Sequence, residues 1–213
     1  MLRKIFGHRG LPQVYRENTF KSLNKAQEVC DFVETDVRIT KDQELILYHD
    51  AIIQGKKIEE CTLSDITELI DIEISDIHLI SRKQVKGDTN FELKINSKDD
   101  ELNNVFLEKI INLTNPEDIV SSFNWEMILN NRKSFKSKYG ILIDKENQLF
   151  ESKAMSNLDE KLMFMVEKEI FYSRNFNLPL ERCVVWTIND KDEINSVLNM
   201  NVYGVVTDIG DKL

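Results

Sequence analysis

The sequence predicts an α/β fold, a compact (β/α)₈ barrel, on three observations. Short apolar runs recur along all 213 residues, and helical patterns separate most of these runs. Such an alternation favours a parallel sheet with helical crossovers. An open doubly wound sheet is the structural rival, but the chain has only seven glycines and no Gly-rich dinucleotide-binding pattern. Roughly eight strand–helix units favour the closed barrel, although 213 residues is near the lower size limit of that fold.

The expected strands are short runs rich in apolar and β-branched residues, or runs in which apolar and polar residues alternate. Residues 32–39, for example, read FVETDVRI and alternate in this way. Residues 162–166 (LMFMV) suit a helix almost as well as a strand. The expected strands are 3–7, 32–39, 44–48, 91–95, 118–123, 139–143, 162–166, 183–188 and 203–208.

Helical patterns fill most of the intervals between these strands. Glu17-Asn18-Thr19 is a plausible cap for the first helix, and Thr62 or Ser64 for a later one. Residues 51–90 have the weakest pattern, so we expect an irregular excursion from the barrel there. No linker-like stretch divides the chain, and we expect 1–213 to form a single domain. The expected helices are about 19–29, 62–70, 99–113, 124–133 and 190–200.

The composition narrows the class of protein. A net charge of −9 argues against a nucleic-acid-binding surface, although local cations can still bind a small anionic substrate. No apolar run is long enough to span a membrane, and the apolar run near the start is too short for a signal peptide. Three cysteines without a close Cys-x-x-Cys spacing indicate free thiols. We therefore expect a cytoplasmic protein with no stable membrane insertion and no nucleic-acid partner; nothing in the sequence sets an oligomeric state.

Ionisable residues gather in or just after successive predicted strands, near their C-terminal ends. In a (β/α)₈ barrel this is the end at which active sites are built. Each pair alone is a weak signal, because a strand-end histidine or an exposed acid–lysine pair is often only structural. Their joint placement on successive strands favours a functional site. The residues are His8, Arg9, Glu34, Asp36, His49, Asp50, Glu92 and Lys94.

Two of these pairs have a spacing that places both side chains on one face. Glu34 and Asp36 are two residues apart on a strand, and so are Glu92 and Lys94. Buried charges cost several kcal/mol each unless they are paired or bind a metal ion. Three carboxylates with few neighbouring cations repel one another, and a hard divalent cation relieves that repulsion. Oxygen ligands of this kind suit Mg²⁺ or Ca²⁺.

The remaining residues of the group suit phosphate chemistry. His8 and His49 can take up and release protons near neutral pH. Arg9 and Lys94 supply positive charge for a phosphate, and Gly10 allows the backbone to turn sharply out of the first strand. The combination predicts metal-assisted phosphoester chemistry.

These residues lie in motifs by which the sequence resembles the glycerophosphodiester phosphodiesterase family. The resemblance implies a (β/α)₈ TIM barrel that hydrolyses a glycerophosphodiester to an alcohol and sn-glycerol 3-phosphate. It also implies that the family's usual insertion after the third strand is reduced here. The motifs occur in the family's order over nearly the whole chain and are GHRG (7–10), ENT (17–19), ETDVRITKD (34–42), HD (49–50), ELK (92–94), WTIND (186–190) and YGVVTD (203–208).

The resemblance also implies the roles of the reacting groups. His8 and His49 match the acid–base pair of the family. Glu34, Asp36 and Glu92 match its metal-binding carboxylates, which would hold a divalent ion, Mg²⁺ or Ca²⁺. Whether the nucleophile is water or a glycerol hydroxyl stays open.

Further residues are implied to bind the substrate or to support those that do. Arg9 and Lys94 match phosphate-contacting residues, and Trp186 matches an aromatic that lines the glycerol side of the pocket. Glu17 and Asp50 are expected to support the residues that contact the ligands.

Two other residues are assigned from their surroundings alone. Phe123 suits a core position better than a pocket wall, and His78, without a motif around it, is expected on the surface. Residues 151–182 match the family poorly, so the helix of the seventh barrel unit is expected to be abnormal.

Two alternative functions stay open. One is a phosphodiesterase for another head group, such as a sugar or polymer phosphodiester. The other is a catalytically weak relative that binds a phosphorylated ligand; the presence of both histidines and all three carboxylates argues against it.

Overall fold

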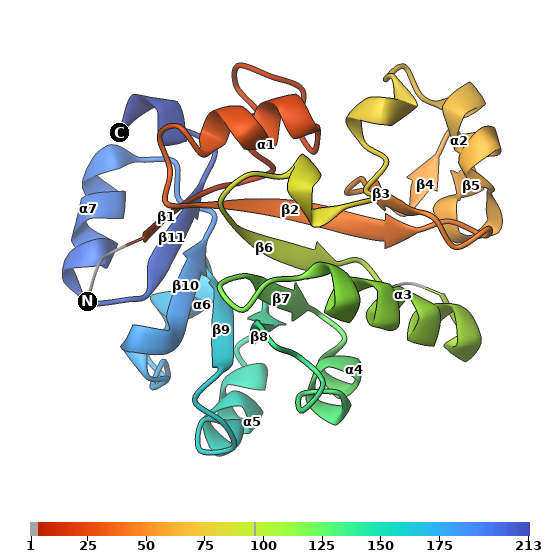
Figure 1. Ribbon diagram of the computed structural model, residues 1–213. Coiled ribbons are helices and arrows are strands. Elements are labelled where there is room, and N and C mark those ends of the chain that lie inside the picture. Colours follow the sequence, from red (N-terminus) through yellow and green to blue (C-terminus); the bar gives the residue numbers. More distant parts are fainter. Residues whose placement is uncertain (1–3, 96) are drawn as a thin grey trace.

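The computed structural model describes residues 4–95 and 97–213, and within them eight parallel strands close into a barrel (Figure 1). Closure comes from β1, which pairs with β11 on one side and with β2 on the other. The predicted (β/α)₈ barrel is therefore confirmed, and 162–166 belongs to a strand. The barrel strands are β1 (Lys4–Gly7), β2 (Phe32–Ile39), β6 (Asp88–Leu93), β7 (Ile119–Ser122), β8 (Lys138–Ile143), β9 (Leu162–Glu167), β10 (Cys183–Trp186) and β11 (Gly204–Thr207).

One predicted barrel strand lies outside the barrel. The strand β3 (Leu45–Leu47) pairs antiparallel with the end of β2, so that it extends the sheet and His49 follows a hairpin. The reason is the length of the connection. Only residues 40–44 join β2 to β3, whereas a parallel crossover needs a dozen or more residues.

Helices cover the outside of the barrel (Figure 1). Within the predicted cap Glu17-Asn18-Thr19, it is Thr19 that caps the first helix, because its side chain accepts a hydrogen bond from the N–H of Ser22. The helix after β9 has only four residues and lies within 151–182, where we expected an abnormal helix. Because β3 lies outside the barrel, this helix belongs to the sixth barrel unit and not to the seventh. The covering helices are α1 (Phe20–Ala26), α3 (Asp100–Leu113), α4 (Trp125–Asn130), α5 (Gln148–Met155), α6 (Lys168–Phe171) and α7 (Lys191–Asn199).

The segment between β3 and β6 is more regular than predicted. It contains the hairpin β4 (Ile52–Ile53) and β5 (Lys56–Lys57), the helix α2 (Leu63–Leu69) and several 3₁₀ turns. Its apolar residues form a small separate core with Ile46 of β3, made by Ile53, Ile58, Cys61 and Ile66. A complete capping box, in which Thr62 and Asp65 bond each other's backbone, starts α2.

His78, which we expected on the surface, is held at the return of this segment. Its Nε2 lies 2.8 Å from Glu44 Oε2, and only 18 % of the side chain is exposed. Its backbone also forms an isolated antiparallel β-bridge with Ile46 of β3. The prediction was wrong because the pairing partner lies 34 residues away and no local pattern indicates it.

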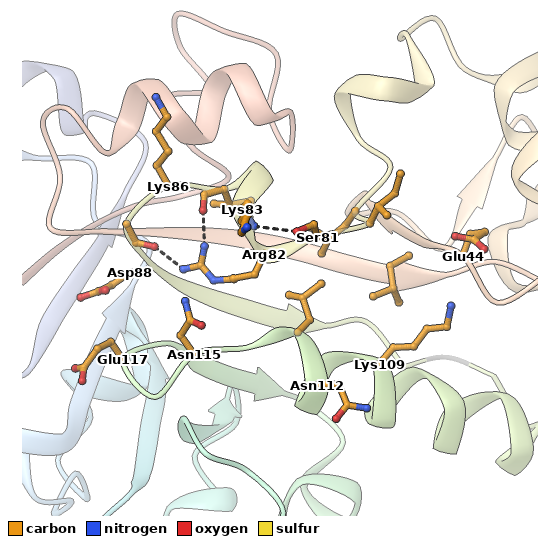
Figure 2. A pocket seen from close by; sticks show the side chains of 16 residues that line it. Glu44, Ser81, Arg82, Lys83, Lys86, Asp88, Lys109, Asn112, Asn115 and Glu117 are labelled. Carbon is orange, nitrogen blue, oxygen red and sulfur yellow. Dashed lines mark hydrogen bonds between the residues drawn. The ribbon is translucent and has the colours of Figure 1, made fainter.

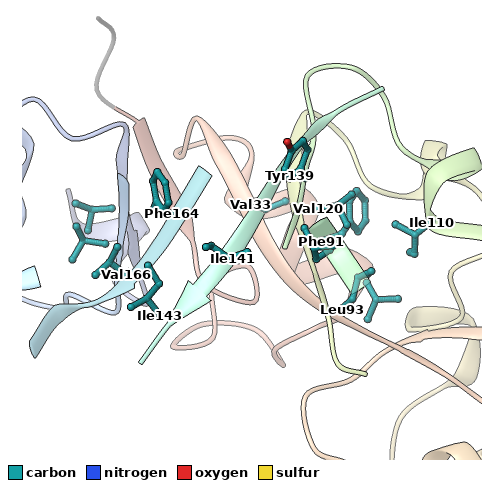
Figure 3. Close-up of a cluster of buried hydrophobic side chains, with 14 of the residues drawn as sticks. Val33, Phe91, Leu93, Ile110, Val120, Tyr139, Ile141, Ile143, Phe164 and Val166 are labelled. Carbon is teal, nitrogen blue, oxygen red and sulfur yellow. The ribbon is translucent and has the colours of Figure 1, made fainter. Parts of the chain in front are cut away.

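Two apolar layers follow from the alternation of side chains along each strand. Val33 and Val37 of β2 face the helices in the outer layer, part of which Figure 3 shows. Phe32 faces the barrel interior with Phe6, Met163 and other residues. Since Glu34 and Asp36 are in phase with Phe32, they too face the interior, above its apolar floor.

Two expectations drawn from composition are met in part. Cys30, Cys61 and Cys183 are all free and buried. Among the described residues, no helix combines the length and apolarity needed to cross a membrane.

Candidate active site

The three predicted metal-binding carboxylates meet at the C-terminal end of the barrel. Glu34 and Asp36 come from β2 and Glu92 from the neighbouring β6, where strand register places Glu92 beside Asp36. One carboxylate oxygen of each lies within 4.8 Å of the others, and all three residues are buried. Such a trio of oxygen donors could hold a metal ion.

Cations and an amide compensate the charge of Asp36. Arg9 Nε lies 3.1 Å from Asp36 Oδ2, and Lys94 Nζ lies 3.0 Å from Oδ1. Asn18 Nδ2 donates to Oδ2 at 2.8 Å. Burial alone would raise the pKa of Asp36, but Lys94 and Arg9 outweigh it and hold this pKa below its usual value. Asp36 is therefore a stable anion in the floor of the site.

Glu34 is compensated much less. Its Oε2 accepts the backbone N–H of Arg9 at 3.0 Å, while its buried Oε1 has no hydrogen-bond partner among the described residues. Burial, together with the charge of Asp36, raises the pKa of Glu34 to about 8. A buried, unpaired carboxylate oxygen is costly, and a divalent cation bound beside it removes that cost. The donor set thus fits a hard metal ion.

His8 stands immediately after β1, beside this cluster. Its Nε2 lies 3.9 Å from Glu34 Oε2, and its Nδ1 lies 2.6 Å from Asp208 Oδ1. Burial acts to lower the pKa of His8, but the hydrogen bond to Asp208 and the charge of Glu34 raise it above its usual value. One nitrogen of the ring is therefore engaged outside the cavity, and the other faces the carboxylates.

His49 reaches the site from the loop after β3. Its Nδ1 lies 2.8 Å from Asp50 Oδ1. The buried Arg38 donates to the His49 carbonyl from Nε at 3.0 Å and to the Lys94 carbonyl from Nη1 at 3.3 Å. Arg38 thus ties together the two loops that carry His49 and Lys94.

A tight turn places Arg9. Arg9 and Gly10 have φ values of +52° and +91°, and a Cβ on Gly10 would lie 2.3 Å from Ser22 Oγ. Only glycine fits this position. Arg9 Nη1 donates to Glu17 Oε1 at 3.0 Å.

Seven of the ten predicted site residues border a cavity of about 260 Å³ at the barrel mouth, whereas Glu17, Asp36 and Asp50 do not line it. One side carries the histidines and charged groups, and the other is apolar. The rings of Phe123 and Trp186 pack edge to face, with their centroids 6.1 Å apart. Phe123 is 43 % exposed and lines this cavity, so the core position expected for it was wrong. The lining residues are His8, Arg9, Glu34, His49, Asn90, Glu92, Lys94, Phe123, Leu142, Met165, Trp186, Thr187 and Val206.

A larger groove lies elsewhere on the molecule (Figure 2). It measures about 1090 Å³ and lies on the outside of the barrel, between residues 79–88 and α3. None of the predicted site residues lines it.

Sequence reasoning missed several polar residues that hold the site. Asn18 Oδ1 accepts from Thr35 Oγ1 at 2.8 Å and from the Asp36 N–H at 3.0 Å. Asp208 and Asn189 form a pair behind His8. Their motifs, ENT, WTIND and YGVVTD, were visible, but nothing local indicated which residue each side chain contacts.

Comparison with known proteins identifies the family of the chain. The pattern of the glycerophosphoryl diester phosphodiesterase family matches residues 8–212. A glycerophosphodiester phosphodiesterase structure from Thermotoga maritima has 27 % identity and a TM-score of 0.77, covering 99 % of this chain and 96 % of that one.

Two further relatives span most of the chain. An Oleispira antarctica phosphodiesterase in complex with the product sn-glycerol-3-phosphate shares the fold, with 18 % identity, a TM-score of 0.77, and 99 % and 95 % coverage. The uncharacterized protein MG293 of Mycoplasma genitalium is 26 % identical over 92 % of this chain and 91 % of its own. The chain thus belongs to the glycerophosphoryl diester phosphodiesterase family and is a phosphoric diester hydrolase.

Proposed function

We propose that this protein hydrolyses glycerophosphodiesters to an alcohol and sn-glycerol 3-phosphate in a metal-dependent reaction with two acid–base histidines. The observation that carries the proposal is the shared cavity. It brings His8 and His49 to the same space as Glu34 and Glu92, with Asp36 beneath.

Glu34, Asp36 and Glu92 would hold the metal ion, and the unpaired Glu34 Oε1 supports this assignment. Their oxygen donors suit Mg²⁺ or Ca²⁺. A bound divalent cation supplies Lewis-acid polarisation of the phosphate oxygens. Lys94 and Arg9, held by Asp36, add positive charge beside the phosphate.

The two histidines would move the protons. One takes a proton from the attacking water or glycerol hydroxyl, and the other gives a proton to the leaving alkoxide. Each ring engages an aspartate through Nδ1, which leaves Nε2 for the substrate. Trp186 and Phe123 form an apolar wall on which the carbon face of glycerol packs.

The experiment measures glycerol 3-phosphate released from glycerophosphocholine and glycerophosphoethanolamine with Mg²⁺, Ca²⁺ or EDTA. Release that EDTA abolishes and either ion restores supports both the reaction and the metal. Release that persists in EDTA contradicts the metal dependence. Absence of release from both diesters, with release from a sugar phosphodiester, assigns the site to another head group.

We also propose that residues 1–213 act as a single domain in the cytoplasm. The three free, buried thiols support a reducing compartment.

A further inference from the structure

We propose that Asp208 is a positioning residue that fixes His8 in the tautomer protonated on Nδ1 and keeps Nε2 aimed at the carboxylates. The inference rests on the proposed function, since His8 belongs to the same site. It adds a residue at the far end of the chain that touches none of the three carboxylates.

The contact itself sets the tautomer. Asp208 Oδ1 lies 2.6 Å from His8 Nδ1. Burial acts to raise the pKa of Asp208, but the hydrogen bond and charge of His8, with the hydrogen bond from Asn189 and the charge of Arg9, hold this pKa below its usual value. An ionised carboxylate only accepts hydrogen bonds, so Nδ1 must be the donor. The neutral ring then carries its lone pair on Nε2, the nitrogen that lies 3.9 Å from Glu34 Oε2.

Barrel closure places the two residues together. β1 and β11 pair in parallel with Gly7 opposite Thr207, and the His8 N–H donates to the Thr207 carbonyl at 2.9 Å. His8 and Asp208 are the next residues along each strand. Their side chains therefore meet at the end of the same ladder, although 200 residues separate them.

Asn189 holds Asp208 in place. Its Nδ2 donates to Asp208 Oδ2 at 2.5 Å, and its Oδ1 accepts the Asp208 N–H at 2.8 Å. The Thr207 hydroxyl donates to the same Oδ1 at 3.2 Å. Both oxygens of Asp208 are thus engaged, one by His8 and one by Asn189, so the carboxylate cannot rotate without losing a bond.

The aspartate beside the other histidine is held much less. Asp50 lies 2.8 Å from His49, but it is the next residue on the same loop and its side chain is 70 % exposed. The side chain of Asp208 is only 25 % exposed, and Asn189 in the loop after β10 donates a hydrogen bond to it. Asp208 is therefore the aspartate whose geometry can fix a tautomer.

The test is Asp208→Asn, read first by ¹⁵N NMR of histidine-labelled, metal-free protein at alkaline pH, where the rings are neutral. His8→Gln identifies the His8 signals. We expect the wild-type ring to carry its proton on Nδ1. In the variant the Asn amide donates to Nδ1 and the proton moves to Nε2. Replacing an aspartate that orients a catalytic histidine by asparagine costs about 10⁴-fold in kcat in a well-studied triad. We expect a loss of about 10³–10⁴-fold here, with KM little changed.

Asp190→Asn is the matched control. Asp190 follows Asn189 in the loop after β10 and caps α7, a role that asparagine performs equally well. The Asp190→Asn variant should therefore change neither the tautomer of His8 nor kcat. Asn189→Ala, which leaves Asp208 in the chain, should give a mixture of tautomers and an intermediate kcat. It keeps the test decisive if Asp208→Asn does not fold.

Two results would overturn the proposal: an Nδ1-protonated His8 in both Asp208→Asn and Asn189→Ala, or wild-type kcat in both variants. Because the NMR signal needs no substrate, it separates this proposal from the proposed function. If the wild-type protein hydrolyses no diester and the tautomer still depends on Asp208, the proposed function fails and the positioning role stands.

Discussion

All three histidines lie within hydrogen-bonding distance of a carboxylate, but only His8 and His49 border the site. His49 Nδ1 lies 2.8 Å from Asp50, and His78 Nε2 lies 2.8 Å from Glu44. His49 lines the cavity at the barrel mouth, whereas His78 fastens the segment that returns to β3. At the scale of single residues, an acid–histidine pair does not by itself define function; the cavity does.

This pair gives a matched experiment. His49→Ala should lower kcat by about 10²–10⁴-fold, because a positioned acid or base contributes that much. Because the His49 side chain is partly exposed, the protein should still fold. His78→Ala removes an equivalent contact and should leave kcat unchanged. Steady-state kinetics on a glycerophosphodiester, with circular dichroism for folding, provides the measurement; equal effects of both changes would contradict the role of His49.

At the scale of elements, the turn from β1 into α1 positions site residues, as the strands do. It carries His8 and Arg9, and it delivers the Arg9 N–H to Glu34. Gly10 completes it against the first turn of α1, where there is no room for a methyl group. The turn therefore depends on a close approach between backbone and helix.

Two glycines isolate the effect of that approach. Gly10 and Gly55 both have positive φ, +91° and +82°, but a Cβ on Gly55 meets nothing within 4 Å. Gly55→Ala should cost only the left-handed backbone, about 1–2 kcal/mol of unfolding free energy. Gly10→Ala adds a steric clash worth about 1–3 kcal/mol more. Urea unfolding of both variants tests this, and equal destabilisation would contradict the predicted clash between a Cβ at position 10 and α1.

At the scale of the whole molecule, the protonation of the site changes the unfolding free energy of the entire protein. Burial and Asp36 raise the pKa of Glu34 from 4.5 to about 8 in the metal-free protein. Between these values the folded state binds more protons than the unfolded state, so unfolding free energy falls as pH rises. The protein gives up stability to keep carboxylates together.

The corresponding prediction concerns pH. Metal-free protein should lose stability from about pH 4.5 to about pH 8, by at most about 1.4 kcal/mol per pH unit for this group. Glu34→Gln should remove that component of the slope, and saturating Mg²⁺ or Ca²⁺ should oppose it by favouring the deprotonated site. Urea unfolding across this range is the measurement. An identical slope in the variant would contradict the raised pKa.

Local patterns predicted the barrel and the residues at its mouth, since alternation along β2 already places Glu34 and Asp36 on one face. They did not predict contacts that depend on closure or on distant pairing. β3 has the composition of a barrel strand, and only the short connection before it makes it a hairpin. Asp208 reaches His8 only because the last strand pairs with the first.

That last pairing has a consequence for how the protein comes into being. During synthesis, the carboxylates and both histidines leave the ribosome within the first half of the chain, long before β11 exists. Until β11 docks between β1 and β10, the sheet is open at one edge and His8 has no aspartate beside it. An incomplete nascent chain therefore carries the three carboxylates and both histidines but lacks Asp208, and we expect His8 to be positioned only when the last strand pairs with the first.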